Sequence, residues 1–140
     1  MTPEEAEAEL AALFDETETL IGGSWENHDS PVPRACEPVS GGTGVQFRLQ
    51  RFGEGETDSA AIAEVAERVA ALWKEHGYES TISDEGELGI EVAAQNDRRS
   101  HLLFGMNTNA TTLDGGSSCE PGDPDDEKYY DYLEDPTLLE

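Results

Sequence analysis

Two cysteines, Cys36 and Cys119, enclose most of the patterned part of this 140-residue chain. Each lies in a polar, turn-rich segment just outside a periodic element, whereas a free buried cysteine usually lies within an apolar run. They form no C-x-x-C pair and have no histidines at metal-ligand spacing, which disfavours a zinc or redox motif. We therefore predict a disulfide that ties the two ends of one domain together, and with it an oxidising, extracytoplasmic location.

Two alternatives stay open from the residues alone: two unrelated thiols, or reactive chemistry at one of them. A disulfide has a sufficient structural reason to exist. Closing a loop of roughly 83 residues stabilises a fold by about 4 kcal/mol in the chain-entropy model. That is a large share of the stability of a single domain whose residues are only 36% apolar.

The net charge of −24 is concentrated at the two ends of the chain. Residues 1–21 carry seven acids and no base, and residues 120–140 carry nine acids and one lysine. Because nucleic-acid binding needs a basic track, this composition excludes it, and it excludes attraction to an anionic membrane as well. The acidity has two interpretations. One is solubility or adaptation to salt or acid; the other is mimicry, in which an acidic surface occupies a basic site on a nuclease or toxin.

The chain contains no apolar run long enough for a transmembrane span. Its start, residues 1–5, is acidic where a secretion signal is basic and then apolar. For an exported protein we therefore expect the signal to have been removed before this start. A cytoplasmic origin is the direct rival of the disulfide prediction.

Two amphipathic helices are predicted. The first spans residues 3–21 and begins with a capping box from Thr2 to Glu5. The second is capped by Thr57 or Asp58 and ends at His76 and Gly77. Each has one apolar stripe at helical spacing and a charged remainder, so each should pack one side on a sheet.

Strands are predicted where apolar residues alternate, at residues 45–52, 78–83, 88–94 and 101–108, with a last strand or extended arm at 111–113. Residues 24–43, with three prolines, are expected to be irregular. The order α-β-α-β-β-β predicts one α+β domain over residues 1–120. It would have a mostly antiparallel four-stranded sheet, two helices on one face and one disulfide. Residues 121–140 are predicted to form an acidic tail, with a short helix as an alternative.

No catalytic group is predicted. His28, Asp29 and Ser30 are neighbours in sequence, but a catalytic triad needs convergence in space. Cys36 with His28 or His101 as its base would need a reduced cysteine in a positive environment, which this acidic chain offers poorly. We therefore expect a protein that is not an enzyme.

No metal or cofactor is predicted either. Residues 123–134 place carboxylates at the offsets of a calcium-binding loop, but Lys128 stands where the loop needs glycine. The histidines, His28, His76 and His101, lack zinc-ligand spacing.

Four aromatic residues are candidate contacts for a partner: Trp25, Tyr129, Tyr130 and Tyr132. The alternative is structural, with the tyrosines folding back on the domain and Trp25 anchoring a loop.

Three segments carry a resemblance to a known group of proteins. They are Trp25 followed eleven residues later by Cys36, the helix ending from Leu72 to Tyr78, and the closing stretch from Leu113 to Cys119. Together they resemble small actinobacterial cell-envelope lipoproteins of the mycobacterial type, whose function is unknown. The resemblance implies one exported α+β domain stapled by a disulfide and tethered through an N-terminal lipidated cysteine. This chain departs from the pattern, because no such cysteine lies near its start.

From these observations we expect an exported, non-enzymatic binding or accessory module of the bacterial cell envelope. Its contact surface would be the sheet face opposite the helices, or the cleft near Cys36 and Cys119, and its partner an unidentified protein or envelope ligand. The alternative is an acidic inhibitor or immunity-type protein that occupies a basic site on a nuclease or toxin.

Overall fold

The computed structural model describes residues 1–129, apart from the side chains of Ser30 and Pro31. Helix α1 spans Pro3–Ile21 and α2 spans Ser59–Glu75. The strands are β1 Trp25–Asn27, β2 Ser30–Cys36, β3 Gly44–Glu54, β4 Glu79–Asp84, β5 Ile90–Gln95, β6 His101–Met106, β7 Ala110–Gly116 and β8 Glu120–Pro121. Two short 3₁₀ turns are η1 Gly86–Leu88 and η2 Glu127–Tyr129.

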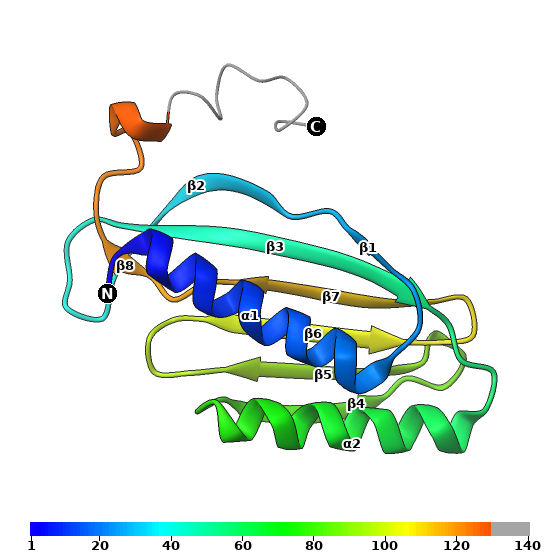
Figure 1. Ribbon diagram of the computed structural model, residues 1–140. Helices are drawn as coiled ribbons and strands as arrows, with labels where there is room; N and C mark the ends of the chain where they lie inside the picture. The colour runs from blue at the N-terminus through cyan, green and yellow to red at the C-terminus, as the bar shows by residue number, and fades with distance from the viewer. Residues whose placement is uncertain (130–140) are drawn as a thin grey trace.

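All eight strands form one antiparallel sheet built around the long strand β3 (Figure 1). β1 and β2 follow one another along one edge of β3. β7 and β8 follow one another along its other edge. Beyond β7 the sheet continues through β6 and β5 to β4, which forms the far edge.

The predicted four-stranded sheet and its α-β-α-β-β-β order are wrong, because the sheet has eight strands. Two of the additional strands, β1 and β2, lie in the proline-bearing segment that the sequence predicts to be irregular. Proline cannot donate a ladder hydrogen bond, but it is tolerated in strands at a sheet edge, which is where β1 and β2 lie. The two helices, the antiparallel pairing and the disulfide are confirmed.

Both helices begin as their sequences dictate. The Thr2 side chain accepts a hydrogen bond from the Glu5 amide, and the Glu5 side chain accepts one from the Thr2 amide. In α2 the Asp58 carboxylate accepts from the Ala60 amide. α1 ends at Gly22, whose φ of 81° is a conformation that glycine adopts readily.

The core lies between the helices and one face of the sheet. Phe14 of α1 and Trp73 of α2 are fully buried against Leu49, Phe104 and other apolar residues of the strands. Burying each such side chain contributes roughly 1.5–3 kcal/mol, so this layer holds the helices on the sheet. α1 runs over β3, and α2 runs along β4 and β5 (Figure 1).

Arg51 fastens one end of α1 to the sheet. Its side chain is only 4% exposed, and its guanidinium pairs with Asp15, with Glu18 at 2.6 Å and with Asp29 at 2.9 Å. It also lies over the Phe14 ring. Burial lowers the pKa of Arg51, but hydrogen bonds to these three carboxylates outweigh it, so the pKa is raised on balance and the cation is fixed.

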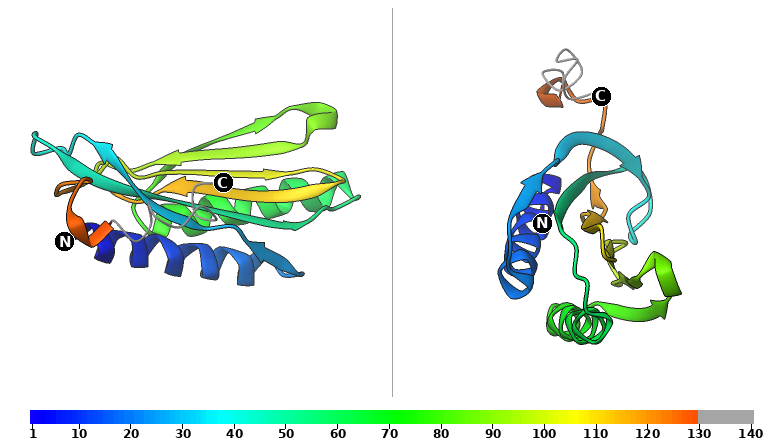
Figure 2. Two further views of the ribbon diagram at one scale, coloured as in Figure 1. Left: turned by 90° about the horizontal axis from the view of Figure 1, so that it is seen from above. Right: turned by 90° about the vertical axis from the view of Figure 1, so that its right-hand side faces the viewer.

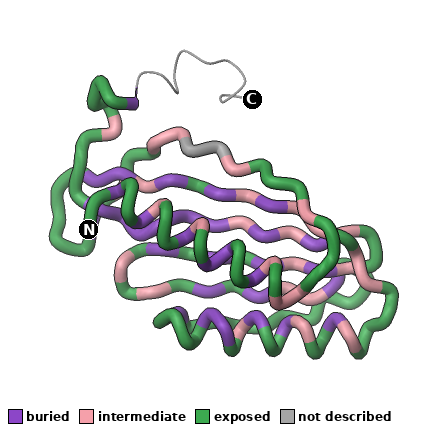
Figure 3. The backbone as a smooth tube through the Cα atoms, viewed as in Figure 1, coloured by how far each residue is buried: buried purple, intermediate pink, exposed green. Residues whose placement is uncertain are grey.

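The opposite face of the sheet, here called the open face, carries no helix of the described chain (Figure 2). Along β6 the exposed His101 and Leu103 alternate with the buried Leu102 and Phe104, as Figure 3 shows for the strands in general. In β3 the side chains of Gln46 and Arg48 share this face, because they alternate with buried core residues.

The start of the C-terminal segment packs on the domain. Tyr129 of η2 is 2% exposed and lies against Val45 and Phe47. Its hydroxyl donates a hydrogen bond of 3.0 Å to Glu4, and Lys128 pairs with the same carboxylate. Within residues 121–129 the predicted tail contains the end of β8 and one short 3₁₀ turn, and residues 130–140 lie outside the described residues.

Candidate functional site

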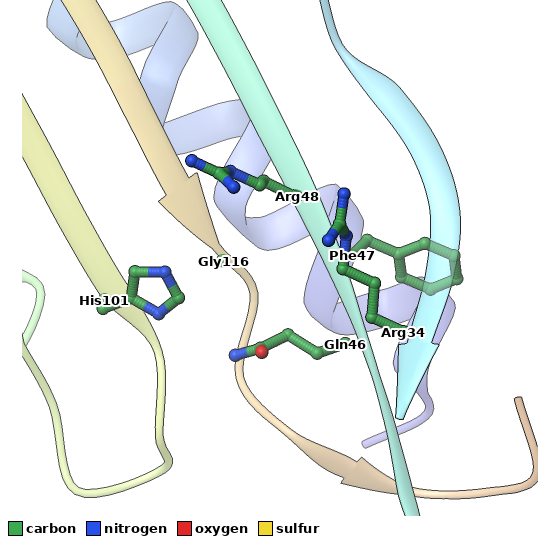
Figure 4. Close-up of a pocket in the computed structure, with 6 residues that line it drawn as sticks. All are labelled: Arg34, Gln46, Phe47, Arg48, His101 and Gly116. Atoms are coloured by element: carbon green, nitrogen blue, oxygen red, sulfur yellow. The ribbon is translucent and has the colours of Figure 1, made fainter. Parts of the chain in front are cut away.

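A basic pocket of about 180 Å³ opens on the open face, near the end of the sheet that holds the disulfide. Its lining residues come from β2, β3, β6 and β7 (Figure 4): Arg34, Gln46, Phe47, Arg48, His101 and Gly116. A water molecule takes about 30 Å³ in the liquid, so the basic pocket has room for about six waters or a small polar group.

At the floor of the basic pocket, Gly116 allows side chains of the neighbouring strands to approach the backbone closely. Gly116 of β7 pairs with Arg48 of β3 on one side and with His101 of β6 on the other. A Cβ atom on Gly116 would lie 2.5 Å from the His101 ring and 3.1 Å from the Gln46 amide nitrogen. Glycine therefore lets the His101 ring and the Gln46 amide pack directly over the backbone of β7.

The polar walls are held in place by their neighbours. Arg48 donates from Nε and Nη2 to the two carboxylate oxygens of Asp114, at 2.9 and 2.7 Å. These hydrogen bonds and the aspartate's charge raise the pKa of Arg48. Gln46 donates to the carbonyl oxygens of Arg99 and Ser117, at 3.0 and 2.7 Å. The bidentate pair between Arg48 and Asp114 fixes both the position and the orientation of the guanidinium.

A second, wider hollow of about 530 Å³, here called the side groove, shares His101 with the basic pocket. Its lining is mainly polar: Val39, Gln95, Asn96, Asp97, Arg99, Ser100 and His101. Asn96 shapes this turn by accepting hydrogen bonds from the amides of Arg98 and Ser100. Arg99 has a φ of 66°, a left-handed conformation that is uncommon for residues other than glycine and asparagine.

Positive charge is concentrated at these two hollows. Three of the eight lysines and arginines, Arg34, Arg48 and Arg99, line them, although the chain as a whole carries a net charge of −24. Arg34 and Arg99 make no ion pair with the residues that the structure describes. Within the described residues, the site therefore offers two arginines that no carboxylate pairs with.

The structure brings the two predicted cysteines together. Cys36 and Cys119 form a disulfide with Cα atoms 6.1 Å apart, which confirms the pairing. Both cysteines are consumed by it, so Cys36 has no free thiol for the catalytic arrangement considered with His28 or His101.

The aromatic candidates for partner contact have structural positions. The Trp25 indole donates to the Gly22 carbonyl at 3.0 Å, and its ring covers Gly53 of β3. Tyr129 is buried, as described above. Tyr130 and Tyr132 lie outside the described residues, and a partner role for any of the four stays a prediction.

The remaining sequence candidates do not converge. His28 pairs with Glu26 at 3.3 Å and its ring meets the edge of Phe52, while Asp29 binds Arg51. Nothing is described of the Ser30 side chain. Within residues 1–129 no three potential metal ligands gather, and the acidic stretch at 123–134 extends past them.

Sequence reasoning missed the basic pocket. The sequence pattern gave Arg34 and Arg48 no role, and His101 was considered only as a metal ligand or a base. The pairing of Gly116 with both Arg48 and His101 depends on strand register, which the local pattern does not give. The one available signal was a pair of glycines, Gly115 and Gly116, next to a strand, which often marks a close approach of backbone or ligand.

The fold and site define an antiparallel α+β domain with one disulfide. No protein-family model matches the chain, and no curated protein matches it. Among solved structures, its fold is similar to that of a DUF4853 family protein from Actinomyces odontolyticus, an actinobacterium. The TM-score is 0.54 at 12% sequence identity, over 82% of this chain and 64% of the other. The neighbour's family is a domain of unknown function, so the likeness shows the fold alone.

No helix within residues 1–129 is both long enough and apolar enough to cross a membrane.

Proposed function

We propose that this chain is an exported, non-enzymatic binding module of an actinobacterial cell envelope, and that it contacts its ligand through the basic pocket. The observation that carries the proposal is the row Arg48–Gly116–His101, an open, polar and cationic seat on a sheet face that no described helix covers. Ligand sites are typically concave, with a few fixed polar groups, and this seat has that form.

Export is supported by the disulfide, since such bonds persist in oxidising compartments and are rare in the cytosol. The actinobacterial origin of the structural neighbour agrees with the resemblance carried by the sequence. Tethering by a lipidated cysteine belongs to the same proposal. That cysteine would have to be a residue other than Cys36 and Cys119, which are already joined.

A non-enzymatic role is supported by what surrounds His101. Its neighbours in the basic pocket, Arg34, Gln46 and Arg48, are hydrogen-bond donors suited to holding a ligand. None of them is an ordinary nucleophile or a general base. The pocket is therefore suited to binding.

The test is co-sedimentation of the oxidised chain with isolated actinobacterial cell envelopes. We expect the wild-type protein to sediment with the envelopes and Arg34→Ala to weaken that binding. Arg68→Ala is the matched control, because Arg68 is an exposed arginine of α2. The proposal fails when the wild-type protein stays in the supernatant, or when both variants bind equally.

A second candidate is the acidic inhibitor, and the specific observation in its favour lies on α1. Asp15 and Glu16 stay 72% and 53% exposed there, along with Glu5 and Glu9. This candidate predicts tight binding to a cationic protein that weakens steeply with salt. Replacing Glu9 and Glu16 by glutamine would weaken such binding, and Arg34→Ala would not.

A further inference from the structure

We infer that the basic pocket and the side groove together form the seat of a carboxylate-bearing, hydroxyl-rich ligand of the sugar-acid class. The inference rests on the proposed function in using the same pocket, and it adds the chemical class of the ligand. It follows from three features of the site: its charge, its shape and the polarity of the adjoining groove.

The charge selects a monoanion. Arg34, Arg48 and Arg99 contribute three positive charges, and Asp97 and Asp114 contribute two negative ones. One positive charge remains with His101 neutral. A single carboxylate balances it, whereas a phosphate with two charges would leave an excess negative charge beside two aspartates on an already acidic protein.

The shape places the carboxylate among the side chains of Arg34, Arg48 and His101. Figure 4 shows the side chains of Arg34, Arg48 and His101 around this glycine. Arg48 uses Nε and one N–H of Nη2 on Asp114, so the N–H groups of Nη1 and the second one of Nη2 are not used in this pair. Arg34 makes no ion pair within the part of the chain that the structure describes, and its planar guanidinium matches the two oxygens of a carboxylate.

The side groove selects for hydroxyl groups next to that carboxylate. It adjoins the pocket through His101 and presents the exposed side chains of Gln95 and Asp97, which accept or donate hydrogen bonds. Arg99 is kept in a left-handed conformation, which is unfavourable for a residue with a side chain relative to glycine. Contact between the Arg99 side chain and the ligand would explain why a large cationic residue stands at this position.

The experiment is an NMR titration of the full oxidised chain with D-glucuronate, compared with acetate, glucose and inorganic phosphate at constant ionic strength. We expect glucuronate to shift the amide resonances of Gln46, Arg48, His101 and Gly116 saturably. Acetate, glucose and phosphate should each bind about tenfold more weakly or worse.

Three variants fix the location. Arg34→Ala should weaken glucuronate binding about tenfold or more, because it removes a charge-assisted hydrogen bond. Gly116→Ala should weaken it as well, because the added methyl group would collide with the His101 ring and displace this wall of the pocket. Arg68→Ala should leave it unchanged.

Phosphate binding as tightly as glucuronate would overturn the choice of a carboxylate, and acetate or glucose binding as tightly would overturn the sugar acid. Absence of a saturable shift, or an affinity that neither pocket variant changes, would overturn the site itself. If the chain does not bind glucuronate but still sediments with cell envelopes, only the ligand class is rejected. Failure of the wild-type chain to bind envelopes rejects the proposed function.

Discussion

Cys36, the last residue of β2, is joined to Cys119, which lies between β7 and β8 and is 83 residues further along the chain. The two cysteines therefore clamp strands that flank β3 on opposite edges. Arg34 stands two residues before Cys36, so the disulfide also fixes the strand that supplies one wall of the basic pocket.

Removing the disulfide should cost much of the domain's stability. For Cys36→Ser with Cys119→Ser we expect the free energy of unfolding to fall by about 4 kcal/mol, because the unfolded chain regains the entropy of an open loop. Urea denaturation of the oxidised protein and the double variant measures it. Hydrogen exchange should rise first in β2, and equal stability of the two proteins would contradict the structural role.

Replacing Arg51 should destabilise the fold more than any exposed arginine does. Arg51→Met leaves the carboxylates of Glu18 and Asp29 largely buried without their cation, which costs about 3 kcal/mol. The matched Arg68→Met should change the free energy of unfolding by less than about 0.5 kcal/mol. Thermal denaturation of both variants decides this, and a similar loss in both would refute the fastening role.

The bond between the two helices can be tested with a nearly isosteric change. The Trp73 indole donates to the Thr17 hydroxyl at 3.1 Å, and both residues are fully buried. Thr17→Val leaves that N–H without a partner, so we expect a loss of about 1–3 kcal/mol. In the Trp73→Phe background the same substitution should cost less, and a double-mutant cycle measures the difference.

Stability should depend on pH with opposite sign at two glutamates of α1. Burial, followed by the charges of Asp29 and Glu4, raises the pKa of Glu7. The folded state therefore binds more protons there than the unfolded state. This contribution falls as pH rises from the unfolded pKa through the raised folded one. Glu7→Gln should stabilise the protein at pH 7 and change little at pH 3.

Glu5 is the matched control for that prediction. Its hydrogen bonds with the Thr2 backbone and side chain lower its pKa, so its contribution is present at neutral pH and is lost as pH falls through the lowered value. Glu5→Gln should therefore not stabilise the protein at pH 7. Denaturation curves from pH 3 to 7 that moved the same way for both variants would contradict these assignments.

The elements with local signals could be predicted from the sequence. The capping box at Thr2 and Glu5 and the apolar stripes defined both helices, and alternation defined β3, β5 and β6. β1 and β2 were missed because their backbone is ordered by pairing with β3. The local sequence of this proline-bearing segment gives no sign of that pairing. Propensity yields to tertiary context in such strands.

The candidate site could not be predicted, because its residues are distant in sequence and meet only through strand register. Arg34, Arg48 and His101 lie on three strands, and Gly116 between the last two makes them a pocket. Arg51 illustrates the same limit: nothing in its neighbourhood in sequence shows that three acids from elsewhere surround it.

We propose that this disulfide-closed domain works outside the cytosol. The most direct test of this proposal is mass spectrometry of protein isolated from its native cells and treated with an alkylating agent, without reductant. We expect an intact mass two hydrogens below that of the reduced chain, no alkylation, and a crosslinked peptide containing Cys36 and Cys119. Alkylation of both cysteines in the folded, unreduced protein would contradict the account.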